Sequence, residues 1–196
     1  MEKAKGETTR DLIVQAAYEL IIEQGYHGTS MRQIAQNAGI ALGGIYNHFS
    51  SKEEIFKAVI TDYHPYHQFV PALSAAEGET IEELFKHAVG NLMPILLERK
   101  DIFNLMFIEL VEFKGSHVPE LFDEFFPPLL TFVQKLGQAQ GELRDLTPPS
   151  LIRAFSSLML GYMLTGQLLA DQLPEQSNDQ SLQDFVEIYL HGILKS

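Results

Sequence analysis

Hydrophobic residues recur at helical spacing along most of the chain, and no stretch alternates as a half-buried strand does. The pattern predicts an all-α protein of about nine helices, separated by turns that are rich in glycine, proline and polar residues. The predicted helices span residues 8–24, 30–38, 42–49, 51–64, 80–99, 101–113, 118–139, 148–171 and 182–194. Residues 71–79 are expected to form a loop.

Cap signals mark where several of these helices begin. They are Ser51 with Glu54, Thr80 with Glu83, and Thr147 before Pro148. Between the fourth helix and the fifth, Pro65 and the loop around Pro71 interrupt the pattern, which indicates a domain boundary there.

Residues 29–52, TSMRQIAQNAGIALGGIYNHFSSK, predict two short helices around a tight turn. Ile34 on the first helix and Ile45 and Phe49 on the second have the spacing of side chains that share a small core. Gly39 stands where the backbone must take a positive φ, which glycine adopts without a Cβ clash. This is the pattern of a helix-turn-helix, whose second helix enters the DNA major groove.

The wider stretch 10–59 resembles the amino-terminal domain of the TetR/AcrR family of transcription regulators. The matching signs are Ala16 and Ala17 in the first helix, EQGY before the motif, TS at the start of the second helix, IA followed by AG, and the G-x-IY-x-HF-x-SKE run. The resemblance implies an amino-terminal three-helix helix-turn-helix domain over residues 7–67. It also implies a carboxy-terminal helical domain over residues 68–196 that binds a ligand and dimerises.

The resemblance also indicates which side chains contact DNA. Tyr46, His48 and Lys52 would donate to phosphates, and Arg32 would reach a base or a phosphate; Tyr46 and His48 packing only the helix end is the alternative. An asparagine such as Asn47 suits an adenine edge because its amide both donates and accepts. The complete predicted DNA surface is Ser30, Arg32, Leu42, Gly43, Gly44, Tyr46, Asn47, His48 and Lys52.

Ala41-Leu42-Gly43-Gly44 departs from the family pattern at two positions. Leu42 stands where the family usually has a lysine or arginine, and Gly44 replaces a hydroxyl residue. Two adjacent glycines also lower helix propensity by ~1 kcal/mol each relative to alanine. We therefore expect a recognition helix that is frayed in the free protein and ordered on DNA, the alternative being that DNA binding has been lost.

The net charge of −12 and the pI of about 4.9 are unusual for a DNA-binding protein. Residues 1–60 hold six cations against seven acidic residues, so most of the negative charge lies in the remainder. Because phosphate attraction depends on local cations, DNA binding is compatible with this balance, although affinity should fall quickly with salt. The absence of cysteines, of a signal-peptide pattern and of a membrane-length apolar run predicts a cytoplasmic protein without membrane contact.

The second domain is rich in aromatic residues and methionine, most of which are expected to pack its core. The resemblance implies that some of them line a site for a small apolar or amphipathic effector. The candidates are Tyr63, Tyr66, His67, His87, Asn91, Phe103, Phe107, Phe126, Met159 and Met163. His64, His67 and His87 suggest a metal site, but Pro65 interrupts their helical face, so we expect no metal and no cofactor. No catalytic motif occurs, and we expect no enzyme activity.

The last two helices carry stripes that would suit pairing between two copies of the chain. The stripes are Ser157, Gly161, Leu164 and Leu168 on one helix, and Phe185, Ile188, Tyr189 and Gly192 on the other. They predict a four-helix dimer interface, with an intrachain core as the alternative. The sequence thus predicts a homodimeric repressor that a small effector releases from a palindromic double-stranded operator. The alternative is a small-molecule-binding or protein-interaction module of the same fold without sequence-specific DNA binding.

Overall fold

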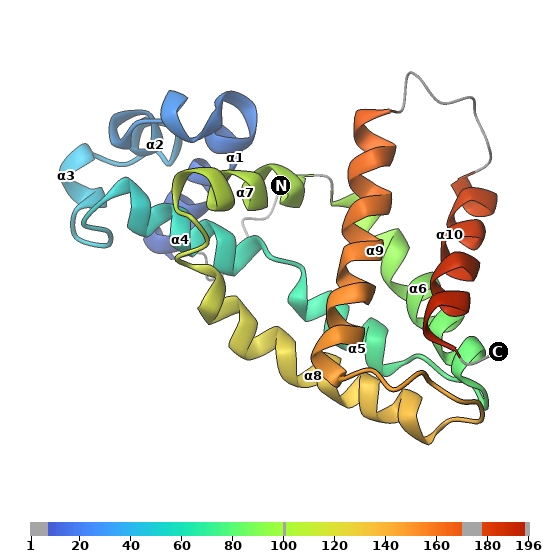
Figure 1. Cartoon of the computed structure of the whole chain (residues 1–196). Helices are drawn as coiled ribbons and strands as arrows, with labels where there is room; N and C mark the ends of the chain where they lie inside the picture. Colours follow the sequence, from blue (N-terminus) through green and yellow to red (C-terminus); the bar gives the residue numbers. More distant parts are fainter. Residues whose placement is uncertain (1–7, 100, 170–177, 195–196) are drawn as a thin grey trace, which may run out of the picture. The chain divides into compact units, whose positions relative to one another are not determined.

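The computed structural model describes residues 8–99, 101–169 and 178–194, and these residues form ten helices (Figure 1). The helices are α1 Thr9–Gly28, α2 Met31–Asn37, α3 Leu42–Ile45, α4 Lys52–Tyr63, α5 Tyr66–Ser74, α6 Ile81–Glu98, α7 Asp101–Glu112, α8 Val118–Gln138, α9 Pro148–Leu168 and α10 Asn178–Ile193. The only β pairing within the described ranges is two isolated bridges, Thr80 with Gln140 and Leu143 with Leu194. The all-α prediction is confirmed. No helix of the described part has the length and apolar character needed to cross a membrane.

The helix that the sequence did not predict is α5, which takes in residues 71–74 of the expected loop. Pro71 lies inside it, and a proline inside a helix removes a backbone hydrogen bond. Burial offsets this cost, because Phe69 and Leu73, one turn apart, are 8% and 3% exposed on a helix that packs against α6. Tertiary packing therefore overrides the local signal of the proline.

Some helix boundaries also differ from those predicted, and α10 begins at Asn178 rather than at residue 182. The first helix resumes after a break at Gly25, whose φ is +78°, and continues to Gly28 rather than stopping at residue 24. The recognition helix α3 is only one turn long and ends at Ile45 instead of Phe49, although Phe49 N still donates to the Ile45 carbonyl at 2.9 Å. The poor helix propensity of adjacent glycines accounts for this shortening.

The chain divides into two compact units. One contains the described residues of Met1–His64 and Lys100–Leu121, and the other those of Pro65–Arg99 and Phe122–Ser196. The first break lies close to the predicted boundary at 67/68, but α7 packs with the amino-terminal helices, where the sequence assigned it to the second domain. The reason is that Leu105 of α7 is buried in the core of the first unit.

The first unit has a core built by α1, α2, α3, α4 and α7. Its fully or almost fully buried side chains are Ile13, Val14, Ala16, Ala17, Ile21, Ile34, Ala35, Ile45, Phe49, Ile55, Phe56, Ala58, Val59, Ile60 and Leu105. Arg10 adds a link across it, since Nη1 lies 2.8 Å from Asp62 Oδ2 at the far end of α4. The core therefore packs α1 along α4, with α2 against α1 and α3 against α2.

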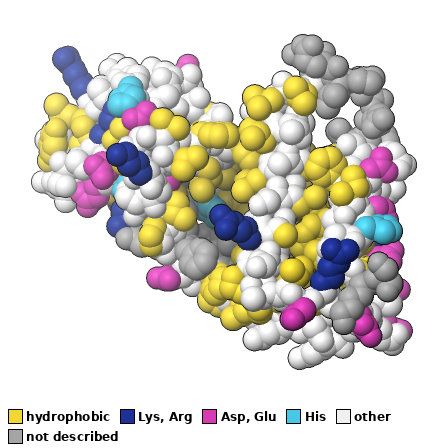
Figure 2. Space-filling view, viewed as in Figure 1, with side chains coloured by type: hydrophobic (Ala, Val, Ile, Leu, Met, Phe, Trp, Pro, Cys, Tyr) yellow, Lys and Arg dark blue, Asp and Glu magenta, His cyan; other side chains and the backbone are white. Residues whose placement is uncertain are grey.

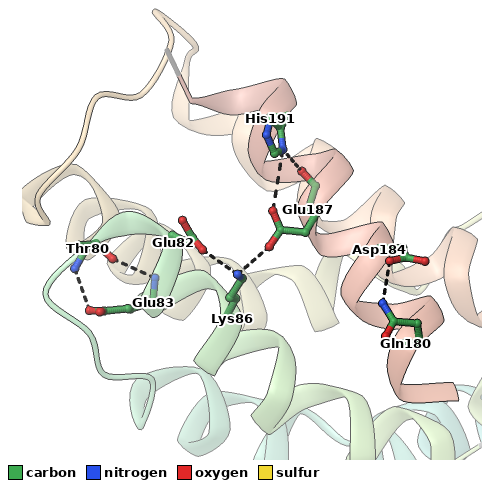
Figure 3. A network of polar contacts seen from close by, with 8 residues as sticks. All are labelled: Thr80, Glu82, Glu83, Lys86, Gln180, Asp184, Glu187 and His191. Atoms are coloured by element: carbon green, nitrogen blue, oxygen red, sulfur yellow. Dashed lines mark hydrogen bonds and ion pairs between the residues drawn. The ribbon is translucent and has the colours of Figure 1, made fainter. Parts of the chain in front are cut away.

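The second unit packs α6 against α5, α9 and α10. The capping box predicted at Thr80 and the cap predicted at Thr147 are present. In the first unit, Ser51 caps α4, but Glu54 accepts from Ser50 N and does not complete a box with Ser51. On the surface, Lys86 lies 2.6 Å from both Glu82 and Glu187 and so joins α6 to α10 (Figure 3). These exposed ion pairs contribute little stability, so the buried apolar side chains hold the unit together.

Candidate nucleic-acid interface

The turn between α2 and α3 is a Schellman motif built on Gly39. Its φ is +69°, as the sequence predicted. The N–H of Gly39 donates to the Gln36 carbonyl at 3.2 Å, and the N–H of Ile40 donates to the Ala35 carbonyl at 3.0 Å. A Cβ at position 39 would meet nothing within 4 Å, so the backbone angle alone requires glycine there.

Ser30 fixes the start of α2. Its hydroxyl accepts from Gln33 N at 3.3 Å, and the Gln33 side chain accepts from Ser30 N at 2.9 Å, which completes a capping box. The residue remains exposed. Ser30 therefore sets the position of α2 whether or not its hydroxyl also reaches DNA.

One side of α3 packs into the core and the other is open. Ile45 is fully buried, whereas Leu42 and Tyr46 lie one turn apart and are 42% and 55% exposed. Figure 2 shows hydrophobic side chains at the α3 end of the first unit. Between them, a Cβ added to Gly43 would meet nothing within 4 Å. The motif thus presents an apolar ridge with an open backbone beside it.

Lys52, predicted to bind phosphate, is hydrogen-bonded within the fold. Its Nζ donates to the carbonyls of Tyr26 and Thr29, each at 2.7 Å, and lies 4.0 Å from the centroid of the Tyr26 ring. Burial lowers the pKa of the Lys52 ammonium, and the nearby Glu112 carboxylate acts in the opposite direction. Lys52 therefore joins the start of α4 to the end of α1, and one of its three N–H groups lies outside these two bonds.

The comparison with known proteins decides the family. The family model described as "Bacterial regulatory proteins, tetR family" matches residues 13–59, which run through α1, α2 and α3 into α4. The chain belongs to this family. The HTH-type transcriptional regulator YvkB of Bacillus subtilis is 24% identical over 187 residues, which cover 94% of this chain and 97% of YvkB.

Solved structures extend the likeness of fold over both units. A tetR-family transcriptional regulator from Mesorhizobium loti is 21% identical, with a TM-score of 0.71, over 98% of this chain and 100% of the other. The transcriptional regulator FadR of Bacillus subtilis, in complex with stearoyl-CoA, is also 21% identical, with a TM-score of 0.66, over 93% and 98%. This TetR-family chain is thus a DNA-binding transcription regulator with a helix-turn-helix.

The predicted DNA residues of this TetR-family chain lie on or beside the motif. Gly44 and Lys52 are half-buried, and the other seven are exposed: Ser30, Arg32, Leu42, Gly43, Tyr46, Asn47 and His48. Only Arg32 contributes an exposed, permanently charged cation to this set. DNA contact by these residues stays a prediction.

The ten predicted ligand residues are divided between the two units. Tyr63, Phe103 and Phe107 lie in the first unit, where Phe103 is buried and Phe107 is 45% exposed. In the second unit, His87 is exposed, Asn91 donates to the Ala72 carbonyl at 3.1 Å, and Phe126 is half-buried. Met159 and Met163 are buried in α9. The side chains of Tyr66 and His67 lie outside the described residues.

The second unit contains an apolar recess that the sequence prediction missed. It measures about 260 Å³, open solvent included, and is lined by Phe85, Leu129, Phe132, Val133, Leu136, Leu151, Ile152, Phe155 and Tyr189. Tyr189 donates to the Leu151 carbonyl at 3.3 Å, its ring stacks on Phe85 at 4.5 Å, and burial raises its pKa to about 12. Helical periodicity identifies these residues as apolar, but it does not show where packing between helices leaves a gap.

The sequence also missed a buried pair at the corner between α7 and α8. Glu109 is fully buried; one carboxylate oxygen accepts from His117 N at 2.8 Å, and the other lies 2.8 Å from His117 Nδ1. The pair lies in the first unit, so Glu109 orders this corner rather than a ligand site in the second unit. Lys114 and Gly115, with φ of 55° and 78°, turn the chain so that the two side chains meet.

Proposed function

We propose that this chain is a homodimeric repressor that leaves a palindromic operator when a small apolar or amphipathic molecule binds its second unit. The observation that carries the proposal is the open side of α3, with Leu42 and Tyr46 exposed next to a backbone without a Cβ. In a helix-turn-helix, this is the side that enters the major groove. The nine predicted DNA residues would then surround the bases and phosphates of one half-site.

Exposed side chains on the last two helices support a dimer. Leu160 and Leu168 of α9 are 55% and 69% exposed, Ile188 of α10 is 71% exposed, and Figure 2 shows hydrophobic side chains along this face. A Cβ at Gly161 would meet nothing within 4 Å, which leaves room for a second copy to approach. Tyr189, predicted for the same stripe, instead stacks in the intrachain core. One helix-turn-helix makes few contacts, so two joined copies would bind a palindrome more tightly.

The apolar recess supports an apolar effector. Its described lining has one side-chain polar group, the Tyr189 hydroxyl, and that group already bonds to a backbone carbonyl. The 260 Å³ of the recess includes open solvent, and its enclosed space is far smaller than the ~300–1,000 Å³ typical of ligand sites, so a drug-sized molecule would have to separate the helices around it. FadR of Bacillus subtilis, which has the same fold, was solved with stearoyl-CoA, and this makes an acyl compound the first to test.

Release requires the effector to prefer the conformation that does not fit the operator. Shifting such an equilibrium from 99:1 to 1:99 takes a preference of ~10⁴-fold, about 5.5 kcal/mol. At ~0.8 kcal/mol per methylene, burial of about seven methylene groups corresponds to this free energy, and a long acyl chain contains more than that. Linkage also requires that bound operator weaken effector binding by the same factor.

A ligand titration with a filled-recess variant tests this proposal. Stearoyl-CoA and stearate should raise the midpoint of thermal unfolding and dissociate the operator complex of the parent protein. Val133→Phe, from the recess wall, should keep operator binding and lose the response, whereas the control Val111→Phe, at an exposed position of α7, should respond normally. The effector part of the proposal fails if neither these compounds nor a wide set of apolar molecules stabilises the protein or releases DNA.

A further inference from the structure

We infer that Leu42 is a specificity-determining residue, which selects operators that present a C5-methyl pyrimidine to α3. The inference rests on the proposed function, since it concerns how the motif reads its operator. It starts from an unusual feature of the recognition element: at the first position of α3 the chain places a branched apolar side chain, 42% exposed, on the side that faces away from the core.

Leu42 has no evident role in the fold of the first unit. Among the described residues, those that form this core or pack against it include its neighbours Ile40 and Ile45 but not Leu42. An exposed leucine forgoes the free energy that burial of its side chain would provide. Contact with an apolar group of a partner would supply that burial.

The surroundings of Leu42 fit close contact with base edges. Tyr46, one turn further on, is 55% exposed on the same side and continues the apolar ridge. Gly43 gains nothing from its small size within the fold, because an added Cβ would meet nothing within 4 Å. The absence of a side chain at Gly43 would allow the groove floor to approach the backbone at this point. Arg32 and Asn47, both exposed, remain available for polar groups next to the methyl contact.

The major groove offers one kind of apolar group at the base edges, the methyl on C5 of a pyrimidine. Thymine carries it, and 5-methylcytosine carries the same group, whereas uracil and cytosine do not. A leucine in place of a cation therefore changes which group of the DNA is recognised. Attraction to phosphates decreases, and affinity depends on the C5-methyl group of a pyrimidine. Discrimination by this contact needs no added charge, which agrees with a first unit in which Arg10 and Lys52 bond to groups of the fold.

The experiment first selects an operator from a random duplex library at low salt. Each thymine of the selected half-site is then replaced by deoxyuridine, and affinities are measured for the parent protein and for Leu42→Ala. At one thymine, loss of the methyl should weaken parent binding about fourfold, the effect of one buried methyl-sized group. Leu42→Ala should bind the thymine operator more weakly by a similar factor and should not respond to the replacement.

Further arms identify the source of the methyl and control for folding. At the sensitive position, 5-methylcytosine should bind better than cytosine when each is paired with guanine, and Leu42→Ala should remove that difference. Leu42→Lys should bind random DNA more tightly, increase the salt slope by about one and lose the methyl preference. Leu97→Ala, a leucine of similar exposure on α6, should behave as the parent protein, and all variants should keep its thermal midpoint.

Three outcomes would overturn the inference. Uracil tolerated at every position would show that no methyl is read, and equal sensitivity of the parent and Leu42→Ala would assign the methyl to another residue. Equal binding of 5-methylcytosine and cytosine would show that the methyl itself is not the recognised group. A library from which no sequence is enriched would instead contradict the proposed function, and the inference with it.

Discussion

Among single residues, the cations of the first unit are of two kinds. Some bond to other groups of the protein, and others are exposed to solvent. Arg10 pairs with Asp62, and Lys52 donates to two carbonyls at the junction of α1 and α2. Arg32 stands out as an exposed cation of the motif. The cations that bond within the fold help to position the motif, whereas an exposed cation is available to DNA. Removal of the two kinds of cation should therefore have different consequences.

Lys52→Ala should lower the free energy of unfolding by about 1–3 kcal/mol, because it removes two charge-assisted hydrogen bonds between helices. Arg32→Ala should leave stability unchanged, but it should weaken DNA binding and reduce the salt slope by about one. Urea unfolding and binding titrations over a range of salt concentrations measure both effects. If Lys52→Ala unfolds as the parent does and loses one unit of salt slope, its ammonium serves DNA rather than the carbonyls.

At the scale of elements, the motif combines a well-defined turn with a marginal helix. The Schellman motif at Gly39 is completely hydrogen-bonded, whereas α3 extends over a single turn and contains Gly43 and Gly44. A helix of this length gains little from its own hydrogen bonds, so packing of Ile45 and Phe49 in the core holds it. Gly39, which the turn requires, and Gly43, which weakens α3, therefore have opposite effects on stability.

Gly39→Ala should destabilise the protein by about 1–2 kcal/mol, because a Cβ residue would be held at positive φ. Gly43→Ala should raise stability by up to ~1 kcal/mol, since its Cβ is unhindered and alanine favours a helix. Gly43→Ala should nevertheless bind operator more weakly, because the new methyl group would stand where the groove approaches. Denaturant unfolding and operator titration test the pair, and equal destabilisation by both substitutions would disprove the account of α3.

The elements that local signals specify were predictable from the sequence. Positive φ at Gly39, the capping box at Thr80 and the cap at Thr147 depend on a few neighbouring residues, and the structure confirms them. The burial of Ile34 and Ile45 followed from helical spacing. What the sequence did not show depends on distant partners: α5 persists through Pro71 because it packs on α6, and Lys52 bonds to carbonyls more than twenty residues away. The ligand candidates stay predictions, but the sequence does not show that α7, which carries Phe103 and Phe107, joins the first unit.

For the molecule as a whole, tight binding to a palindrome would require two copies of the chain acting together. The exposed side chains of Leu160, Leu168 and Ile188 provide an apolar surface on α9 and α10. Exposure of this surface to water is unfavourable. Two copies joined there would bring two helix-turn-helix motifs to one palindrome. Assembly and DNA affinity should therefore change together.

Leu168→Asp and Ile188→Asp should each give monomers in light scattering and weaken operator binding by at least about a hundredfold, since a buried unpaired charge disfavours the interface and avidity is lost. Leu97→Asp, which introduces the same charge at an exposed leucine of α6, should remain dimeric. Dimers that persist in both interface variants would place the contact elsewhere on the chain.

Sequence-specific binding is measured by the ratio of affinities for the selected operator and for a scrambled duplex of equal length and composition, across ~50–200 mM salt. Nonspecific attraction decreases with salt for both duplexes, whereas base contacts act on the operator alone. We expect the operator to bind at least ~10³-fold more tightly throughout this range. We also expect Tyr46→Ala to bring the ratio closer to one. Equal affinity for the two duplexes at every salt concentration would contradict the claim that this chain reads DNA sequence.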